Sequence, residues 1–271
     1  MAQVPVRSGI FPLFLLRTFP YNCDLRQKSL QTWSTQPIRT FVCATHPRLN
    51  VQTRNPADEK GTMSAVRRVL IVSLGNPEAL HDTYHSAGHL ALESLQKRFS
   101  SELSSFTRER YGKKAVLAST GPKYTLLQSP TLMNVSGPWL AKAYKEYLAD
   151  NDLKPEELAL LLVHDDLEEE LGVIKIRQWS RSHRGHNGVK SVMASLKPPS
   201  PAMGSRWARV SVGIGRPEAR DRSAVSDFVL SKIPRHARGI LDEKASRGLY
   251  EALGELERKW EAEEVAAAVA A

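Results

Sequence analysis

The stretch Leu158-Ala159-Leu160-Leu161-Leu162-Val163-His164-Asp165-Asp166 decides the fold. Its first six residues are apolar without a break, and three polar residues follow directly. A strand that is apolar on both faces belongs in the middle of a covered sheet, and covered sheets are mostly parallel. Val69-Leu70-Ile71-Val72 is a second run of this kind, and it ends in the sharp turn Gly75-Asn76-Pro77. The two runs together predict a central sheet that is buried on both sides.

In the rest of the chain, segments with the apolar spacing of a helix alternate with segments that have the pattern of a strand. Helical spacing of apolar residues predicts helices near 87–95, 138–148, 187–196 and 240–260, and strand patterns are found at 115–119, 124–128, 174–178 and 208–215. Strands that alternate with helices predict a single α/β domain with a mixed, mostly parallel central sheet flanked by helices. We place this domain at residues 63–262 and expect 263–271 to be a frayed tail.

The first 62 residues differ from the rest in composition. They contain 8 Lys/Arg and 3 Asp/Glu, and hydroxyl and apolar residues separate the arginines. This composition is typical of a mitochondrial transit peptide, and a tail without an address or a true start at Met63 are the alternatives. Both cysteines, Cys23 and Cys43, lie in this segment, so the predicted domain forms no disulfide. A mitochondrial location is expected, or a cytoplasmic one if translation starts at Met63.

Charge is unevenly distributed over the predicted domain. Of the net +9, residues 1–62 account for +5 and the remaining residues for +4. Residues 172–217, however, contain nine Lys/Arg and no Asp or Glu. Such a stretch attracts a polyanion, with phosphate as the leading candidate, although a solvated basic face gives the same pattern. No run reaches the roughly 18 apolar residues that span a bilayer, so no membrane partner is expected.

The carboxyl ends of the predicted strands carry the candidate site. In open α/β sheets the residues at these ends line the ligand crevice, and Asn76, Asp165 and the Gly215 turn all occupy such positions. His85 follows Asn76 by nine residues and has a side chain that exchanges a proton near neutrality. Asp165 at a buried strand end could orient that imidazole, and otherwise serves as a helix cap or salt-bridge partner. No nucleophile is evident, so water activated by His85 is the simpler proposal.

Two asparagines lie in glycine-flanked turns ahead of predicted helices. They are Asn134, in Met133-Asn134-Val135-Ser136-Gly137, and Asn187, in Gly185-His186-Asn187-Gly188. Asparagine is a good helix N-cap, and its carboxamide also holds a carbonyl, a water or a ribose hydroxyl without changing charge. Both interpretations stay open on the sequence alone.

Two other kinds of site have partial support in the sequence. His81, His85 and His89 are spaced by four, and His183 and His186 form a second pair, but no Cys or Glu completes a familiar zinc pattern. Gly213-Ile214-Gly215 resembles half of a nucleotide-binding loop, but the third glycine is missing and Arg216-Pro217 follows instead of a helix start. We therefore expect neither a metal nor an organic cofactor.

Seven segments, taken in chain order, resemble the bacterial-type peptidyl-tRNA hydrolase family across about 200 residues. They are Leu74-Gly75-Asn76-Pro77, Thr83-Tyr84-His85-Ser86-Ala87-Gly88, Leu132-Met133-Asn134-Val135-Ser136-Gly137, His164-Asp165-Asp166-Leu167, Gly185-His186-Asn187-Gly188-Val189-Lys190, Val212-Gly213-Ile214-Gly215-Arg216-Pro217 and Asp227-Phe228-Val229-Leu230. Their shared order and near-family spacing make the resemblance specific.

The resemblance implies a fold, an activity and roles for particular residues. It implies hydrolysis of the ester between a peptide and the terminal ribose of tRNA, with peptidyl-tRNA as the partner and a monomeric enzyme that needs no protein partner. His85 is then the catalytic base and Asp165 orients it. Asn76, Asn134 and Asn187 position the water, the peptide backbone and the tRNA end. The implied tRNA contacts are Lys175, Arg177, Arg184 and Lys190.

The chain departs from the family pattern near the site. Leu80 lies where a Tyr is usual, Tyr84 and Ser86 where Arg and Asn are common, Arg184 replaces a Gly, and Ser211 replaces a basic residue. These departures affect the contacts with the peptide and with tRNA, whereas His85 and Asp165 are both kept. A non-catalytic RNA-binding relative, such as an organelle intron-splicing factor, is the alternative function.

Overall fold

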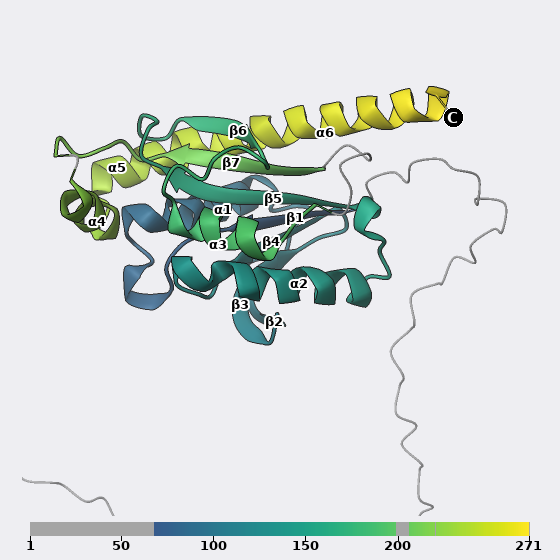
Figure 1. Cartoon of the computed structure of the whole chain (residues 1–271), viewed down its shortest axis with the longest axis horizontal. Helices are drawn as coiled ribbons and strands as arrows, with labels where there is room; N and C mark the ends of the chain where they lie inside the picture. The colour runs from purple at the N-terminus through teal and green to yellow at the C-terminus, as the bar shows by residue number, and fades with distance from the viewer. Residues whose placement is uncertain (1–67, 199–205, 220, 271) are drawn as a thin grey trace, which may run out of the picture. The chain divides into compact units, whose positions relative to one another are not determined.

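A computed structural model describes residues 68–198, 206–219 and 221–270 of the chain. The expected transit peptide at 1–62 lies outside the described residues. Figure 1 shows one central sheet with helices on both of its faces. The strands are β1 (Arg68–Ser73), β2 (Thr107–Tyr111), β3 (Lys114–Thr120), β4 (Tyr124–Gln128), β5 (Leu158–Asp166), β6 (Ile174–Gln178) and β7 (Trp207–Gly213).

The seven strands pair in the order β2-β3-β4-β1-β5-β7-β6. The four central strands β4, β1, β5 and β7 are parallel, while β3 and β6 pair antiparallel with the outer two of them and β2 pairs antiparallel with β3. This confirms the predicted mixed sheet. Strand β2 was not predicted, because its sequence Thr-Arg-Glu-Arg-Tyr has no apolar alternation. Charged side chains are common on such an edge strand, since they discourage pairing with another chain.

The helices are joined to the sheet by short turns. They are α1 (Ala87–Arg98), α2 (Ser136–Asp150), α3 (Asn187–Ser195), α4 (Arg222–Leu230), α5 (Arg235–Ile240) and α6 (Ser246–Ala270), with the 3-10 turns η1 (Glu78–Leu80), η2 (Tyr84–Ser86), η3 (Met133–Val135) and η4 (Pro155–Glu157) and the π-helical turn η5 (Leu241–Ala245). Among the described residues no helix combines the length and the apolar character that crossing a membrane requires.

The sheet separates two hydrophobic cores. Successive side chains of β1 enter opposite cores: Val69 and Ile71 pack with α1, η5 and α6, whereas Leu70 and Val72 pack with α2 and α3. This alternation is the period of two that any strand imposes, and it explains why the strand reads as continuously apolar. Burial of each such side chain contributes about 1.5–3 kcal/mol, so the central strands fix the layered arrangement.

The C-terminal third differs from the prediction in three ways. The expected closing helix is divided into α5, η5 and α6. Helix α4 was not predicted, because none of its side chains is buried; it begins at Asp221, whose carboxylate accepts from the backbone N–H groups of Ser223 and Ala224. The segment expected to be a frayed tail is helical in the structure, since α6 continues to Ala270. Alanine and glutamate are strong helix formers, so this end is helical without an apolar face to bury.

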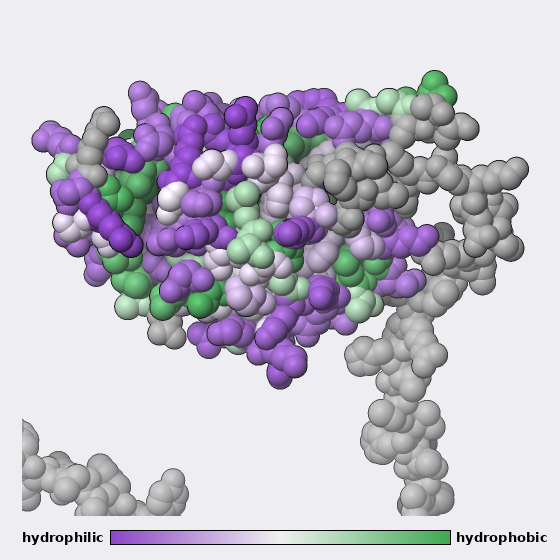
Figure 2. Space-filling model, in the orientation of Figure 1, coloured by the Kyte–Doolittle hydropathy of each residue, from purple (hydrophilic) through white to green (hydrophobic). Residues whose placement is uncertain are grey.

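The end of α6 extends past the sheet. In Figure 1 this helix runs beyond the strands toward the C-terminus. Arg206 forms an ion pair of 2.8 Å with Glu264, and beyond it Val265 and Val269 are exposed. The face seen in Figure 2 is mostly hydrophilic, with hydrophobic residues at the free end of α6. Only the first part of α6, as far as Trp260, therefore contributes to a core.

Candidate active site

His85 and Asp165 are in direct contact although eighty residues separate them. His85 lies in the 3-10 turn η2 between β1 and α1, and Asp165 lies near the carboxyl end of β5. The Nδ1 atom of His85 is 2.9 Å from Oδ1 and 3.0 Å from Oδ2 of Asp165. A carboxylate only accepts, so Nδ1 carries the proton and Nε2 is left as the basic nitrogen. The pairing proposed from the sequence is thus present.

A second imidazole shares the same carboxylate. The Nε2 atom of His186 is 2.9 Å from Oδ1 of Asp165, and its Nδ1 accepts from the backbone N–H of Val189 at 3.3 Å, which makes His186 the N-cap of α3. The two contacts together fix the tautomer of this ring. Its role was not foreseen, because a Gly-His-Asn turn gives no sign of which carboxylate it will meet. Asn187 is the first residue of α3, so it is not the cap that the sequence suggested.

Burial and charge act in opposite directions on this cluster. Burial lowers the pKa of His85, but the charge and hydrogen bond of Asp165 outweigh it, and the pKa of His85 lies above its ordinary value. Burial would raise the pKa of Asp165, yet the charges and hydrogen bonds of the two imidazoles hold it well below its usual range. Asp165 therefore stays ionised at neutral pH and stabilises a proton on His85.

The turn that carries His85 is held by the hydroxyl of Ser86. That oxygen accepts from the backbone N–H of Asn76 at 2.9 Å and donates to the carbonyl of Leu80 at 2.9 Å. Ser86, at a position where the family often has Asn, thus joins the β1 turn to η1 and η2. Gly88 permits the start of α1 to lie against the sheet, because a Cβ there would be 2.7 Å from the carbonyl oxygen of Leu74.

A pocket of about 1090 Å³ opens beside the histidine pair. Its walls come from the carboxyl ends of β5 and β6, the loop between β6 and α3, and helix α4. Five of the predicted site residues line it, namely His85, Asp165, Arg177, Arg184 and Asn187. The other four do not: Asn76 is buried beside η2, whereas Asn134, Lys175 and Lys190 are exposed elsewhere.

Arginines dominate the walls of this pocket. Six of them line it, from β6, the loop before α3, β7, the connection after β7, and α4: Arg177, Arg181, Arg184, Arg209, Arg216 and Arg222. Apolar side chains of α4, including Val225, Val229 and Leu230, complete the lining. A basic pocket with an apolar wall suits a ligand that has both phosphate and less polar parts.

The side chains predicted to contact phosphate differ in whether an acidic side chain already pairs with them. Lys175 pairs with Glu169 at 2.7 Å, and Arg177 pairs with Glu169 and, at 3.2 Å, with Asp166. Arg184 and Lys190 have no ion-pair partner in the part of the chain that the structure describes. The guanidinium of Arg177 also donates to the hydroxyl of Ser211 at 3.3 Å, so a cation from β6 lies beside the position where the family often has a basic residue.

The loop between β6 and α3 is fixed by a buried arginine. Arg209 on β7 is 2% exposed, and its Nη2 atom donates to the carbonyls of Gln178 at 3.3 Å and Arg181 at 2.6 Å. In this loop Arg184 has a φ of +46°, in the left-handed region that favours glycine. This backbone conformation explains why the family usually has a Gly at this position. Arg184 adds a positive charge to the pocket, and its backbone is strained in return.

Three histidine rings lie in a row at the base of the pocket. The His186 ring is 5.0 Å from the His85 ring and 5.0 Å from the His164 ring. His164 donates from Nδ1 to the carbonyl of Asp165 at 2.7 Å, and burial lowers the pKa of His164 to about 3. This ring is therefore neutral and acts as packing behind the site.

The histidines that could bind a metal ion in the structure are not the set suggested by the sequence. His81 and His89 stack on each other, 5.6 Å between ring centroids, away from the pocket. The one group with suitable geometry among the described residues is His85, Asp165 and His186, whose ligand atoms lie within 4.8 Å of one another. Both imidazoles already donate N–H groups to Asp165, so a metal ion would have to replace two protons. The arrangement suits proton transfer at His85 directly.

Comparisons with known proteins agree with this geometry. The model of the peptidyl-tRNA hydrolase family matches residues 70–268. A peptidyl-tRNA hydrolase of Haemophilus influenzae is 37% identical over 164 residues, which are 60% of this chain and 77% of that protein. A probable peptidyl-tRNA hydrolase of Schizosaccharomyces pombe is 34% identical over 191 residues, 69% of this chain and 82% of that protein.

A solved structure has the same fold. The crystal structure of the Arg119Gln mutant of peptidyl-tRNA hydrolase from Acinetobacter baumannii superposes with a TM-score of 0.53 at 26% identity, and the match covers 75% of this chain and 94% of that one. The match to the family model spans both the histidine turn η2 and the aspartate on β5. The chain therefore belongs to the peptidyl-tRNA hydrolase family.

Proposed function

We propose that this protein hydrolyses the ester bond that joins a peptide, or an N-blocked amino acid, to the 3′-terminal ribose of tRNA, which returns the tRNA to translation. The observation that carries the proposal is the 2.9 Å contact between His85 and Asp165 at the wall of a pocket rich in arginine. Family membership supports the reaction type and the substrate.

The geometry supports a general-base mechanism. Nε2 of His85 takes a proton from water as the water oxygen attacks the ester carbonyl. The imidazolium that forms is stabilised by the ionised Asp165, whose second imidazole partner is His186. When the tetrahedral intermediate collapses, the C–O bond to the ribose breaks and His85 returns the proton to the departing hydroxyl. Asn76, Asn134 and Asn187 are proposed to position the water, the peptide backbone and the tRNA end.

The arginines of the pocket are proposed to bind the phosphates near the 3′ end. Arg181 and Arg184 are the strongest candidates, because both are exposed, line the pocket and have no ion-pair partner among the described residues. Lys190 is exposed on α3 and adds positive charge near the same loop. Lys175 and Arg177 contribute less, since Glu169 and Asp166 partly neutralise them.

A turnover assay tests the proposal. The purified chain should deacylate N-acetyl-aminoacyl-tRNA, and His85→Asn should lower kcat by about 10²- to 10⁴-fold. His236→Asn is a matched control, because His236 is exposed on α5 outside the pocket. The activity should persist in EDTA, since His85 needs only Asp165 to act as a base. Full activity of His85→Asn would refute the assignment, and tRNA binding without turnover would favour an RNA-binding relative such as an intron-splicing factor.

Two further properties are proposed from the sequence. We propose that residues 1–62 direct the protein to mitochondria, and a fusion of this segment to a fluorescent protein should then collect in that organelle; diffuse fluorescence would argue for a start at Met63. We also propose a monomer that acts without a protein partner. Light scattering during size-exclusion chromatography should give the mass of one chain, about 30.2 kDa before any processing.

A further inference from the structure

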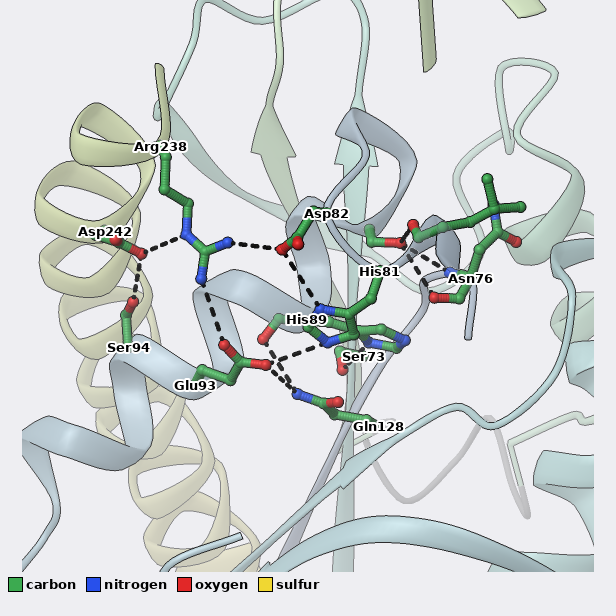
Figure 3. Close-up of polar contacts among 12 residues, drawn as sticks. Ser73, Asn76, His81, Asp82, His89, Glu93, Ser94, Gln128, Arg238 and Asp242 are labelled. Carbon is green, nitrogen blue, oxygen red and sulfur yellow. Dashed lines mark hydrogen bonds and ion pairs between the residues drawn. The ribbon is translucent and has the colours of Figure 1, made fainter. Parts of the chain in front are cut away.

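Arg238 on α5 is the centre of a charged cluster that the reaction does not use. Its guanidinium contacts three carboxylates: Asp82 at 3.1 Å, Asp242 at 3.4 Å and Glu93 at 3.6 Å. Figure 3 shows the guanidinium between these three groups, which come from the connection before η2, from η5 and from α1. One side chain thus joins three separate segments.

Glu93 extends the cluster toward the sheet. Its carboxylate accepts from the side-chain amide of Gln128 at 3.1 Å and pairs with His81 at 3.2 Å. Burial raises the pKa of Glu93, but hydrogen bonds from His81 and Gln128, with the charges of His81 and Arg238, bring this pKa below its ordinary value. Glu93 is therefore ionised, and it is the anion that Arg238 and His81 share (Figure 3).

The residues held by this cluster directly precede the catalytic histidine. Asp82 is three positions before His85 and His81 is four. The same connection is also held by its backbone: the N–H of Ile233 donates to the carbonyl of Asp82 at 3.0 Å, and the N–H of Tyr84 donates to the carbonyl of Ser231 at 3.3 Å. The segment between α4 and α5 is thus paired with the turn that carries His85.

Besides the local contacts of the Ser86 hydroxyl, two long-range anchors therefore act on the segment around His85. On one side Nδ1 of His85 meets Asp165 on β5, and on the other side Arg238 holds the connection that leads into η2. Helix α4, whose residues form one wall of the pocket, is joined by residues 231–234 to α5, which carries Arg238. A displacement of about 1 Å at a reacting group can cost two powers of ten in rate, so a second anchor has a measurable function.

These ion pairs are expected to contribute little to the stability of the whole domain. The side chains of Arg238, Asp82 and Glu93 are 34%, 71% and 28% exposed. Ion pairs with this exposure are screened by solvent and contribute little to stability. Loss of Arg238 is therefore expected to leave the fold in place, while the connection before η2 keeps its backbone hydrogen bonds but loses its side-chain anchor.

We propose that Arg238 is a positioning residue, which fixes the turn carrying His85 against α1 and couples that turn to the helix pair α4 and α5. The inference rests on the proposed function, because it assigns a role in placing the base of that reaction. In this role Arg238 acts only by fixing the position of His85, and it does not contact the substrate.

The test compares Arg238→Met with Arg235→Met in the full chain. Arg235 is exposed on the same helix and is a matched control that should behave as wild type. Arg238→Met should lower kcat about tenfold with KM for N-acetyl-aminoacyl-tRNA unchanged within about twofold. The acid limb of the kcat profile should also move to lower pH, because a loosened His85 loses part of its contact with Asp165.

A second variant covers the case in which Arg238→Met is poorly folded. Asp82→Asn removes the charge of an exposed side chain and should lower kcat in the same direction, and the double variant should be no worse than Arg238→Met alone. Arg238→Lys reaches fewer carboxylates and should be intermediate. An unchanged kcat and pH profile per folded molecule in both single variants would overturn the inference.

The outcomes separate this inference from the proposed function. If His85→Asn is inactive and Arg238→Met matches wild type, the enzyme assignment stands and the positioning role fails. If His85→Asn is fully active, the proposed function itself fails. If all the activity lost in Arg238→Met and Asp82→Asn is explained by a smaller folded fraction in thermal melts, the role is structural and the inference is overturned.

Discussion

At the scale of single residues, the decisive group is the carboxylate of Asp165. It is 3% exposed and accepts from two imidazoles, so it determines both the tautomer of His85 and the proton affinity of its ring. The reaction needs the unprotonated form of His85, whereas Asp165 favours the protonated form. The rate should therefore rise with pH through a pKa that lies above the ordinary value of 6.5.

Asp165→Asn tests this relation. The substitution removes the charge that raises the pKa of His85, so the acid limb of the kcat/KM profile should move to lower pH. The absolute rate should fall on the order of a hundredfold or more, because the imidazolium loses its counter-charge and the ring loses its fixed tautomer. A pH–rate profile of both proteins checks the prediction; an acid limb at an unchanged pH would contradict it.

Arg184→Gly tests the strained arginine. Glycine adopts the φ of +46° freely, so the variant should be as stable as wild type or gain up to about 1 kcal/mol. It also loses a free cation, so tRNA binding should weaken and the slope of log Kd against log salt should decrease by about one. Lys175→Gln is the control, and its smaller effect should reflect the neutralising contact with Glu169. Equal effects of the two variants would argue against this division of charge.

At the scale of elements, short turns and the helices α3 and α4 position the site. Turn η2 presents His85, the N-terminus of α3 presents His186, and α4 closes one wall of the pocket. None of these elements has a large buried face of its own. They depend on neighbours: Ser86 holds η2, Arg209 holds the loop before α3, and the backbone pairing at Ser231 and Ile233 holds the end of α4.

Helix α6 should divide into a structural part and a dispensable part. Trp260 is 3% exposed and packs in the core that contains α1, so Trp260→Ala should lower the free energy of unfolding by about 3–5 kcal/mol. Deletion of residues 265–271 should change it little, because Val265 and Val269 are 65% and 84% exposed. Urea denaturation measures both; a loss of several kcal/mol in the deletion variant would show that the helix end has a structural contact.

At the scale of the whole molecule, four histidines oppose one another in the dependence of stability on pH. Burial holds the pKa of His89 and of His164 at about 3, so each is neutral in the folded protein. The pKa values of His81 and His85 are raised instead, through Glu93 and Asp165, although burial opposes the shift in both. The two pairs therefore act in different pH ranges.

The opposite pKa shifts of the two pairs of histidines predict that the protein is most stable near neutral pH. As pH falls below about 6.5, His89 and His164 bind protons in the unfolded chain but stay neutral in the folded protein. The free energy of unfolding therefore decreases by up to ~1.4 kcal/mol per pH unit for each histidine. As pH rises from 6.5 through the raised pKa values of His81 and His85, the stability that their protonated forms contribute is lost. Urea midpoints at pH 5, 6.5 and 8 check this, and His81→Gln should flatten the alkaline side. A midpoint that rises steadily from pH 6.5 to 8 would contradict it.

The sequence by itself determined the covered sheet, because 69–72 and 158–163 are apolar at every position and only burial on both faces accommodates that. It also marked Asp165, which lies at a strand end, and His85, which follows the turn at Asn76 by nine residues. It missed β2, which is mostly charged, and α4, which has no buried side chain. It also missed the division of the last helix, because the π-helical turn η5 keeps Leu241 and Ala245 buried and so leaves the apolar pattern unbroken.

The tertiary structure alone decided which polar side chains contact one another. Nothing in a linear pattern relates His186 to Asp165, Arg177 to Glu169, or Arg238 to Asp82, because each pair joins segments that only the sheet order and the helix packing bring together. Periodicity reports which face of an element is buried, and it contains no information on which polar side chain meets which. The choice of catalytic pair could be anticipated from strand ends, whereas the network that orients it follows from packing.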